Sequence, residues 1–250
     1  MKYLVLIPAR YQSTRFPGKP LAKIGGEEMI IRVCRQVEKT GFPLAVATDN
    51  LEIASCVRNH GFDAVMTSAN HRSGTERVEE AFRNLRSEAD VVINVQGDEP
   101  FIAPEQITSL AAIFDDNPLT EIATLMRKFN PEEGINALEN PNLVKVVVSD
   151  RNKALYFSRS VIPFLRGIPK DKWLESAIFF SHIGIYAYKS DCLKKIVKLQ
   201  PSSLEMAENL EQLRWLQNGY EIITAISDAP TIGIDTPEDL AEAERYLLTK

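Results

Sequence analysis

The sequence has few cysteines, and their spacing fits neither a disulfide framework nor a zinc ribbon. Cys34, Cys56 and Cys192 are odd in number, far apart and outside any C-x-x-C pattern. A disulfide framework uses an even number of cysteines, and a zinc ribbon uses closely spaced pairs. We therefore expect all three side chains to be reduced thiols.

Long apolar runs are also absent. The run from Tyr3 to Ile7 is too short for a signal-peptide core or a membrane span, and Pro8 ends it. We therefore predict a cytoplasmic protein with no membrane partner. The 250 residues, 44% hydrophobic and 25% charged, allow one large domain with a sizeable core. This composition excludes a disordered or collagen-like chain.

Basic residues are in slight deficit but unevenly distributed. Lys and Arg number 29 against 34 Asp and Glu, for a net charge of -5. We predict no nucleic-acid partner, because such binding depends on neutralising many phosphates. Residues 1–26, however, hold five basic residues and no acidic one. This local positive charge favours a small polyanion as ligand, although a basic surface loop without a ligand gives the same pattern.

Two common nucleotide-binding motifs are missing. The sequence has no G-x-G-x-x-G, and Pro20 follows Gly18-Lys19 where a Walker A loop has Ser or Thr. Their absence disfavours nicotinamide chemistry and P-loop chemistry.

Short β-branched runs alternate with helical patterns along the chain. The candidate strands are residues 3–7, 44–48, 64–67, 91–95, 122–126, 144–148, 183–188 and 221–226. This alternation predicts an α/β fold, with a mostly parallel central sheet and helices on both faces. Residues 130–142 and 163–177 are irregular and longer than most loops, so we interpret them as excursions, the second as a lid.

The loops that follow strands carry the chemistry, because ligands of open α/β sheets bind beyond the carboxyl ends of strands. The loop within Ile7–Leu21 holds Arg10, Arg15 and Lys19 together with Ser13. Arg grips phosphate oxygens with two donors, Lys acts as a point charge, and backbone N–H groups complete an anion site. We therefore predict phosphate binding here.

Two aspartates lie where they are able to hold a metal ion. Asp98 follows the strand 91–95, and carboxylates with phosphates are typical Mg²⁺ ligands. Alternatively, Asp98 caps the helix predicted to begin near Pro104. Asp235 precedes Thr236, which with Asp239 has the pattern of a helix cap and leaves Asp235 without a capping task. Alternatively, the helix dipole explains an acid at this position.

Seven motifs in order give the chain a resemblance to the 3-deoxy-manno-octulosonate (Kdo) cytidylyltransferases, the CMP-Kdo synthetases of Gram-negative bacteria. They are Ile7–Leu21, His71–Arg77, Asn94–Pro100, Ala154–Arg159, His182–Tyr186, Leu210–Arg214 and Asp235–Leu240. The resemblance implies a homodimeric, Rossmann-like nucleotidyltransferase that converts CTP and Kdo to CMP-Kdo and pyrophosphate with Mg²⁺, for lipopolysaccharide synthesis. It implies a single cytidylyltransferase domain over 1–250, with about 130–190 as a substrate-lid and dimerisation excursion.

The resemblance also implies roles for particular residues. Those matching the nucleotide site are Pro8, Ala9, Arg10, Ser13, Arg15, Lys19, Ser73, Gly74 and Gln96. Those matching the sugar pocket are Gln96, Arg159, His182, Tyr186, Glu211 and Gln212. Asp98 and Asp235 match the metal pair, and with Arg15 and Lys19 they are the predicted catalytic residues.

The residues themselves leave structural alternatives open. Ser73 and Glu76 have the spacing of a capping box, so a plain helix start explains them equally well. Strand alternation places His182, Gly184 and Tyr186 on one face, where the gap at glycine suits either a sugar or a packed core.

Glu211 and Gln212 fall in a predicted helix with a clear apolar stripe. The stripe consists of Met206, Leu210, Leu213 and Leu216. A solvated polar face of that helix therefore explains the two residues as well as a sugar site does.

Other functions also stay open. The same chemistry on 8-amino-Kdo or sialic acid requires only one altered contact. A metal-dependent glycosyltransferase would release no pyrophosphate from CTP and free sugar. A non-enzymatic nucleotide sensor would bind CTP without needing Asp98 or Asp235.

Overall fold

The computed structural model describes residues 1–12, 16–230, 233–234 and 236–248. The chain forms two compact units. The first consists of Met1–Ala111, Ala187–Val197 and Ala229–Lys250, and the second of Ala112–Tyr186 and Lys198–Asp228. Each unit is described by itself below.

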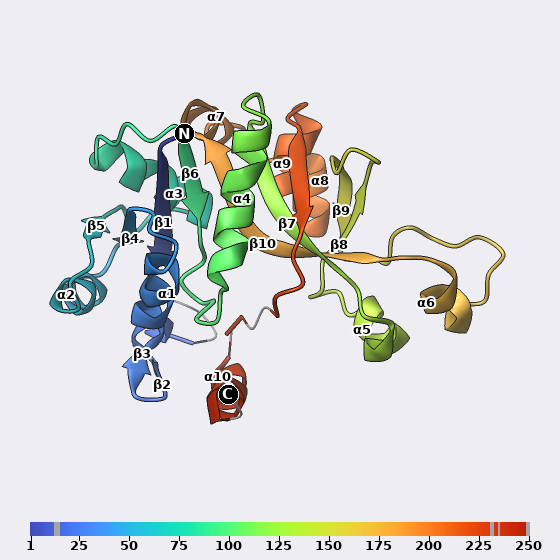
Figure 1. Ribbon diagram of the computed structural model, residues 1–250, viewed down its shortest axis with the longest axis horizontal. Helices are drawn as coiled ribbons and strands as arrows, with labels where there is room; N and C mark the ends of the chain where they lie inside the picture. Colours follow the sequence, from blue (N-terminus) through green and yellow to red (C-terminus); the bar gives the residue numbers. More distant parts are fainter. Residues whose placement is uncertain (13–15, 231–232, 235, 249–250) are drawn as a thin grey trace. The chain divides into compact units, whose positions relative to one another are not determined.

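The first unit is built on parallel strands that lie in the order β6-β1-β4-β5 (Figure 1). These strands are β1 (Tyr3–Ala9), β4 (Leu44–Thr48), β5 (Ala64–Met66) and β6 (Val91–Asn94). In β1, Val5 pairs with Leu44 of β4 and with Ile93 of β6, so β1 is hydrogen-bonded on both edges. Residues Val5, Leu6 and Ile7 are fully buried, because both faces of a central parallel strand are covered.

Helices flank these strands, and several begin directly after a strand. They are α1 (Met29–Glu38), α2 (Leu51–Asn59), α3 (Gly74–Asn84), the first part of α4 (Pro104–Asp116), α7 (Ser190–Ile196) and α10 (Pro237–Leu248). Between β1 and α1 lie the short 3₁₀ helix η1 (Lys19–Leu21) and the hairpin of β2 (Lys23–Ile24) and β3 (Glu27–Glu28). The Asn50 side chain accepts hydrogen bonds from two N–H groups of α2, which fixes the start of that helix.

The second unit has mixed strand pairing. Its strands are β7 (Ile122–Lys128), β8 (Lys145–Val148), β9 (Ala154–Ser158), the part of β10 (Phe180–Lys189) up to Tyr186, and β11 (Ile222–Ile226). β11 pairs with β7 in parallel, whereas β8 pairs with β9 and β10 in antiparallel. Its short helices are η2 (Pro131–Glu133), α5 (Gly134–Glu139), η3 (Lys170–Lys172), α6 (Trp173–Ser176), α8 (Ser203–Glu208) and α9 (Gln212–Gln217).

The predicted fold class is confirmed, and each of the eight predicted strands overlaps an observed one. The sequence analysis missed β2, β3 and β9. The predicted excursions 130–142 and 163–177 contain short helices, which cover a small core of Phe129, Leu138, Trp173 and Phe179. Among the described residues, no helix combines the length and apolar character needed to cross a bilayer.

One predicted helix is wrong. The apolar stripe from Met206 to Leu216 is divided between α8 and α9, because Asn209 adopts a left-handed conformation with φ of 52° and ends α8. Gln212 is 5% exposed at the start of α9. It therefore does not lie on the solvated polar face that one interpretation of the sequence predicted.

Candidate nucleotide-binding site

One pocket of the first unit collects most of the predicted nucleotide residues. Its walls are the end of β1, the helix η1, the start of α3 and the loop after β6. The predicted residues that line it are Pro8, Ala9, Arg10, Lys19, Ser73, Gly74, Gln96 and Asp98. Ser13, Arg15 and Asp235 lie outside the described residues.

Two glycines bring the walls of this pocket together. A Cβ atom at Gly97 would lie 2.8 Å from the backbone oxygen of Pro8, which is closer than packed atoms approach. A Cβ at Gly74 would lie 3.3 Å from the Pro8 ring and 3.4 Å from Gln96 Oε1. Gln96 is itself held by a hydrogen bond of 3.1 Å from its Nε2 to Asn94 Oδ1. The close approach of β1, α3 and the loop after β6 therefore requires glycine, which has no Cβ atom, at positions 74 and 97.

Lys19 and Asp98 form an ion pair at this pocket. Lys19 Nζ lies 2.7 Å from Asp98 Oδ2 and donates a second hydrogen bond of 2.8 Å to the Ile234 carbonyl. The Ile234 N–H donates to the Asp98 carbonyl at 3.0 Å. The segment directly before Asp235 is thus joined to both residues, and 35% of the Asp98 side chain stays accessible.

The helices that begin after the two aspartates are capped by other side chains. At the start of α4, the Gln106 side chain accepts a hydrogen bond from the Ala103 N–H, while the Asp98 carboxylate pairs with Lys19. At the start of α10, Thr236 and Asp239 exchange the two hydrogen bonds of a capping box, as predicted. That cap needs no contribution from the preceding residue.

The carboxyl of Glu99 has an altered acidity. Desolvation by the surrounding protein, reinforced by the Asp98 charge, raises the pKa of Glu99 to about 7. Glu99 is therefore partly protonated at neutral pH, which reduces the negative charge next to Asp98.

Three basic residues of the pocket were not singled out by the sequence analysis. Arg77 is 3% exposed and donates to Thr67 Oγ1 at 2.7 Å and to Asp49 Oδ2 at 2.8 Å. His71 hydrogen-bonds to Glu80, and Arg72 lies 3.6 Å from Glu76. Desolvation raises the pKa of Glu80, but hydrogen bonds from the Ser68 N–H and from His71 outweigh it and lower the pKa overall. Acidic partners thus hold these three side chains in place around the pocket.

The backbone of the first loop differs from the predicted anion site. The Gly18 N–H donates to the Tyr11 carbonyl at 2.9 Å, and the Lys19 N–H donates to the Phe16 carbonyl at 3.3 Å. Both donors are therefore used inside the turn, which Gly18 enters with φ of 71°. Among the described residues of this loop, side chains rather than these two N–H groups are available to an anion.

Ser73 has the capping role that its spacing predicted. Its Oγ accepts from the Glu76 N–H at 3.2 Å, while the Glu76 carboxylate accepts from the Arg72 N–H at 2.9 Å. Ser73 also lines the pocket, so the two interpretations are compatible.

Two predicted sugar residues lie side by side on β10, in the second unit. His182 Nε2 lies 2.9 Å from Thr124 Oγ1, and the His182 and Tyr186 rings are 5.3 Å apart. The Tyr186 ring packs edge-on against Trp215 of α9 at 5.2 Å. Burial lowers the pKa of His182 to about 3, so its imidazole is neutral. These contacts suit a packed core, although a Cβ at Gly184 would have open space around it.

Arg159 is engaged by the protein backbone. Its guanidinium donates to the carbonyls of Glu208 at 2.7 Å, Pro141 at 2.8 Å and Asn209 at 3.3 Å. It thereby satisfies carbonyl groups at the end of α8, which is a structural task. Glu211 lies 3.9 Å from Arg214 at the start of α9. The role of these residues in sugar binding stays a prediction.

Comparison with known proteins places the chain in a family. A model of the cytidylyltransferase family matches residues 4–222. The 3-deoxy-manno-octulosonate cytidylyltransferase of Phocaeicola vulgatus is 53% identical over 247 residues, which are 99% of this chain and 98% of that protein. The chain belongs to the 3-deoxy-manno-octulosonate cytidylyltransferase family. Its relative of the same name in Bacteroides thetaiotaomicron is 52% identical over 247 residues, with 99% and 98% coverage.

A solved structure agrees with this assignment, and a second one resembles the chain in fold. A CMP:2-keto-3-deoxy-manno-octonic acid synthetase complexed with CTP has a TM-score of 0.91 and 39% identity, covering 100% of this chain and 99% of that one. A cytidylyltransferase from Leptospira borgpetersenii has a TM-score of 0.65 at 17% identity, covering 100% of this chain and 88% of that one, and shows likeness of fold alone.

The sequence held a signal for the three pocket residues that the sequence analysis had not singled out. His71, Arg72 and Arg77 lie in a motif that carried the family resemblance, yet only Ser73 and Gly74 were given roles from it. A histidine and two arginines among the seven residues 71–77, at a helix start, are typical of an anion-binding face. Pro20 and Gly97 carried no chemical signal, since they shape the pocket by packing.

Proposed function

We propose that this protein transfers CMP from CTP to Kdo and releases pyrophosphate. The observation that carries the proposal is the pocket where Arg10, Lys19 and Asp98 meet in a chain of this family. The relatives and the CTP-bound neighbour bear the name of that activity. The product would be the activated sugar for lipopolysaccharide synthesis, as the family resemblance implies.

The obstacle to this reaction is electrostatic, because an anionic sugar acid attacks an anionic triphosphate. In the proposed reaction the anomeric hydroxyl of Kdo attacks the α-phosphorus in line with the departing pyrophosphate. Arg10 and Lys19 supply positive charge to the triphosphate, and Arg15 is proposed to join them. Contacts with Asp98 and the Ile234 carbonyl hold Lys19 at the pocket, so its charge already lies where the triphosphate is proposed to bind.

We further infer that Asp98 and Asp235 hold Mg²⁺. The Asp98 carboxylate suits this ion, since it is an accessible oxygen donor at the pocket proposed to bind the triphosphate and already attracts a cation, Lys19 Nζ. The hydrogen bond between Ile234 and Asp98 supports the pairing, because Ile234 directly precedes Asp235 in the chain. Bound Mg²⁺ would offset phosphate charge and favour deprotonation of the attacking hydroxyl. Lys19 would then be available to phosphate oxygens.

One assay tests the proposed reaction and its alternatives together. Pyrophosphate release is measured with CTP, UTP or ATP, each with Kdo, 8-amino-Kdo or sialic acid, with and without Mg²⁺. We expect release with CTP and Kdo only when Mg²⁺ is present. Faster release with 8-amino-Kdo or sialic acid would show that this sugar acid, and not Kdo, is the preferred substrate. CTP binding without pyrophosphate release would overturn the enzymatic proposal.

A homodimer and a cytoplasmic location remain proposals that rest on the family resemblance and the sequence. Light scattering of the purified protein tests the first, with a molar mass near twice the 28.1 kDa chain as the expected result. A mass near that of one chain would contradict it.

A further inference from the structure

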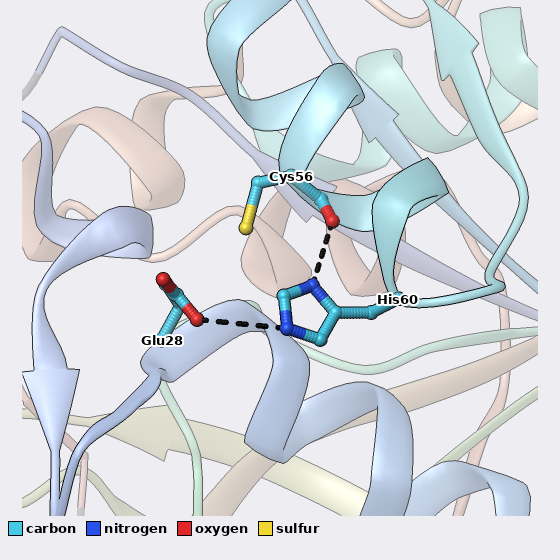
Figure 2. Close-up of side chains that lie close together, drawn as sticks. All are labelled: Glu28, Cys56 and His60. Carbon is cyan, nitrogen blue, oxygen red and sulfur yellow. Dashed lines mark hydrogen bonds and ion pairs between the residues drawn. The ribbon is translucent and has the colours of Figure 1, made fainter.

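The first unit holds a second group of ligand-type side chains, away from the residues that line the pocket. Glu28, Cys56 and His60 each offer one ligand atom, and the three atoms lie within 4.8 Å of one another (Figure 2). Glu28 ends β3 at the start of α1, Cys56 lies on α2, and His60 follows the last residue of α2. We propose that this group binds a divalent transition-metal ion, with Zn²⁺ as the best fit.

The ligand chemistry determines which ion fits. A thiolate and an imidazole favour Zn²⁺ or Co²⁺, whereas Mg²⁺ and Ca²⁺ take oxygen ligands. Ligand atoms at about 2.0 to 2.3 Å from Zn²⁺ in tetrahedral geometry lie roughly 3.3 to 3.7 Å apart. His60 Nε2 and Glu28 Oε2 are 3.9 Å apart, so small side-chain rotations are enough to close the site. This three-ligand set is separate from the oxygen ligands proposed for Mg²⁺.

The hydrogen bond of His60 to the backbone is the strongest sign of a prepared site. His60 Nδ1 lies 2.9 Å from the Cys56 carbonyl oxygen, which only accepts, so Nδ1 carries the hydrogen. Nε2, the other ring nitrogen, then faces the Glu28 carboxylate, as Figure 2 shows, and lies 3.9 Å from Glu28 Oε2. The ring nitrogen and the carboxylate oxygen are thus directed at one position, where either a proton on Nε2 or a bound metal ion would link them. A backbone carbonyl that fixes the ring in this way is typical of zinc-binding histidines.

The surroundings leave a way in for the ion. The His60 side chain is 34% exposed and that of Glu28 is 20% exposed, so water is able to fill the fourth position. Lys23 Nζ lies 3.6 Å from Glu28 Oε1, the other carboxylate oxygen, so Oε2 is left to face His60.

A bound ion would connect two parts of the chain that are distant in sequence. It would fasten the end of β3 and the start of α1 to the end of α2. The hairpin of β2 and β3 directly follows η1, which carries the pocket residue Lys19. The ion would therefore stabilise the first unit close in sequence to the pocket. The proposal does not depend on the nucleotidyltransferase activity.

The test uses Co²⁺ as a spectroscopic probe of the full-length protein, freed of metal by chelation and kept in excess Mg²⁺ to occupy oxygen-only sites. Co²⁺ is added in steps while thiolate-to-cobalt charge-transfer absorption is recorded, and Zn²⁺ is then added. We expect one equivalent to saturate the band and Zn²⁺ to abolish it. Absence of any such band in the unsubstituted protein would overturn the proposal.

Substitutions assign the band to the cluster. Cys56→Ser should remove it, and His60→Ala or Glu28→Gln should weaken Co²⁺ binding at least tenfold. Cys192→Ala, which changes a cysteine outside the cluster, should keep the band. Its persistence in Cys56→Ser, or unchanged affinity in both other variants, would contradict the assignment.

A second measurement guards against misfolded variants. Thermal unfolding of the unsubstituted protein should shift upward with Zn²⁺ and not with an equal concentration of Mg²⁺, because a ligand of the folded state stabilises it. The shift should vanish in Cys56→Ser while CTP binding is kept. An equal Zn²⁺ shift in that variant would place the ion elsewhere. Since neither readout is activity, failure of the proposed reaction leaves this test valid.

Discussion

The predicted nucleotide residues and the predicted sugar residues are placed in the molecule in different ways. The described residues among the former line one pocket of the first unit, where Lys19 also pairs with Asp98 at 2.7 Å. The latter, apart from Gln96, lie within the second unit on β10, at the start of α9 and directly after β9, where His182 and Arg159 contact other parts of that unit. Motifs at strand ends therefore give a clearer functional assignment than polar residues within strands and helices.

The largest effect should come from the proposed metal ligand. Asp98→Asn keeps the shape of the side chain but removes its charge, so turnover should fall by about 10² to 10⁴ while CTP affinity changes little. Steady-state pyrophosphate release and calorimetric CTP titration measure the two quantities. Asp150→Asn changes an exposed aspartate of a turn and should leave both unaltered. Near-normal turnover of Asp98→Asn would contradict the metal-binding role proposed for Asp98.

The next effect concerns the lysine of the same ion pair. Lys19→Ala should weaken CTP binding and also lower turnover, each by roughly tenfold to a hundredfold, because a charged hydrogen bond contributes about 1.5 to 3 kcal/mol. Lys39→Ala, at an exposed lysine at the end of α1, serves as the matched control in the same assays. Unchanged constants for Lys19→Ala would show that this lysine serves only to pair with Asp98.

Alanine substitutions at two glycines, one at the pocket and one on β10, compare the two regions directly. Gly97→Ala places a Cβ atom 2.8 Å from the Pro8 carbonyl, so we expect about 1 to 3 kcal/mol of destabilisation and weaker CTP binding. Gly184→Ala meets no atom within 4 Å and should unfold at nearly the unsubstituted denaturant concentration. If the space at Gly184 admits the sugar, the KM for Kdo rises in that variant alone. Equal stability of the two variants would contradict the packing described for the pocket.

The smallest effect is a pH dependence of stability. Burial lowers the pKa of His182 to about 3, whereas the unfolded residue takes up a proton near its ordinary value of 6.5. Stability from this residue is complete above pH 6.5 and is lost as the pH falls toward 3, by about 1.4 kcal/mol per unit. Urea unfolding at pH 6.5 and 5.5 should therefore show a smaller loss for His182→Gln than for the unsubstituted protein. Identical losses would show that His182 is solvated.

Much of the fold was readable because its signal is local. Buried parallel strands such as Val91–Asn94 form continuous apolar runs, and the Thr236 and Asp239 cap was recognised from two side chains three residues apart. By contrast, Ala154–Ser158 was missed because its apolar Leu155 is exposed and its polar Ser158 is buried, so polarity does not follow burial along this strand. The break at Asn209 was missed because asparagine also fits within a helical pattern, and only the tertiary structure shows its positive φ.

The site was predictable to a similar degree. Strand-end position and charge were enough to single out Arg10, Lys19 and Asp98. The anchoring of Arg77 by Asp49 and Thr67 was not readable, because it joins residues that are distant in sequence. The pairing of Lys19 with Asp98 likewise depends on how β1 and β6 lie next to each other.

The central claim is that Asp98 belongs to a metal site that acts on the triphosphate. Anomalous scattering from a crystal of the protein with CTP and Mn²⁺, used in place of Mg²⁺, tests it most directly. We predict a peak within bonding distance of both an Asp98 carboxylate oxygen and a phosphate oxygen. A bound CTP whose metal ion has no contact with Asp98 would contradict the account.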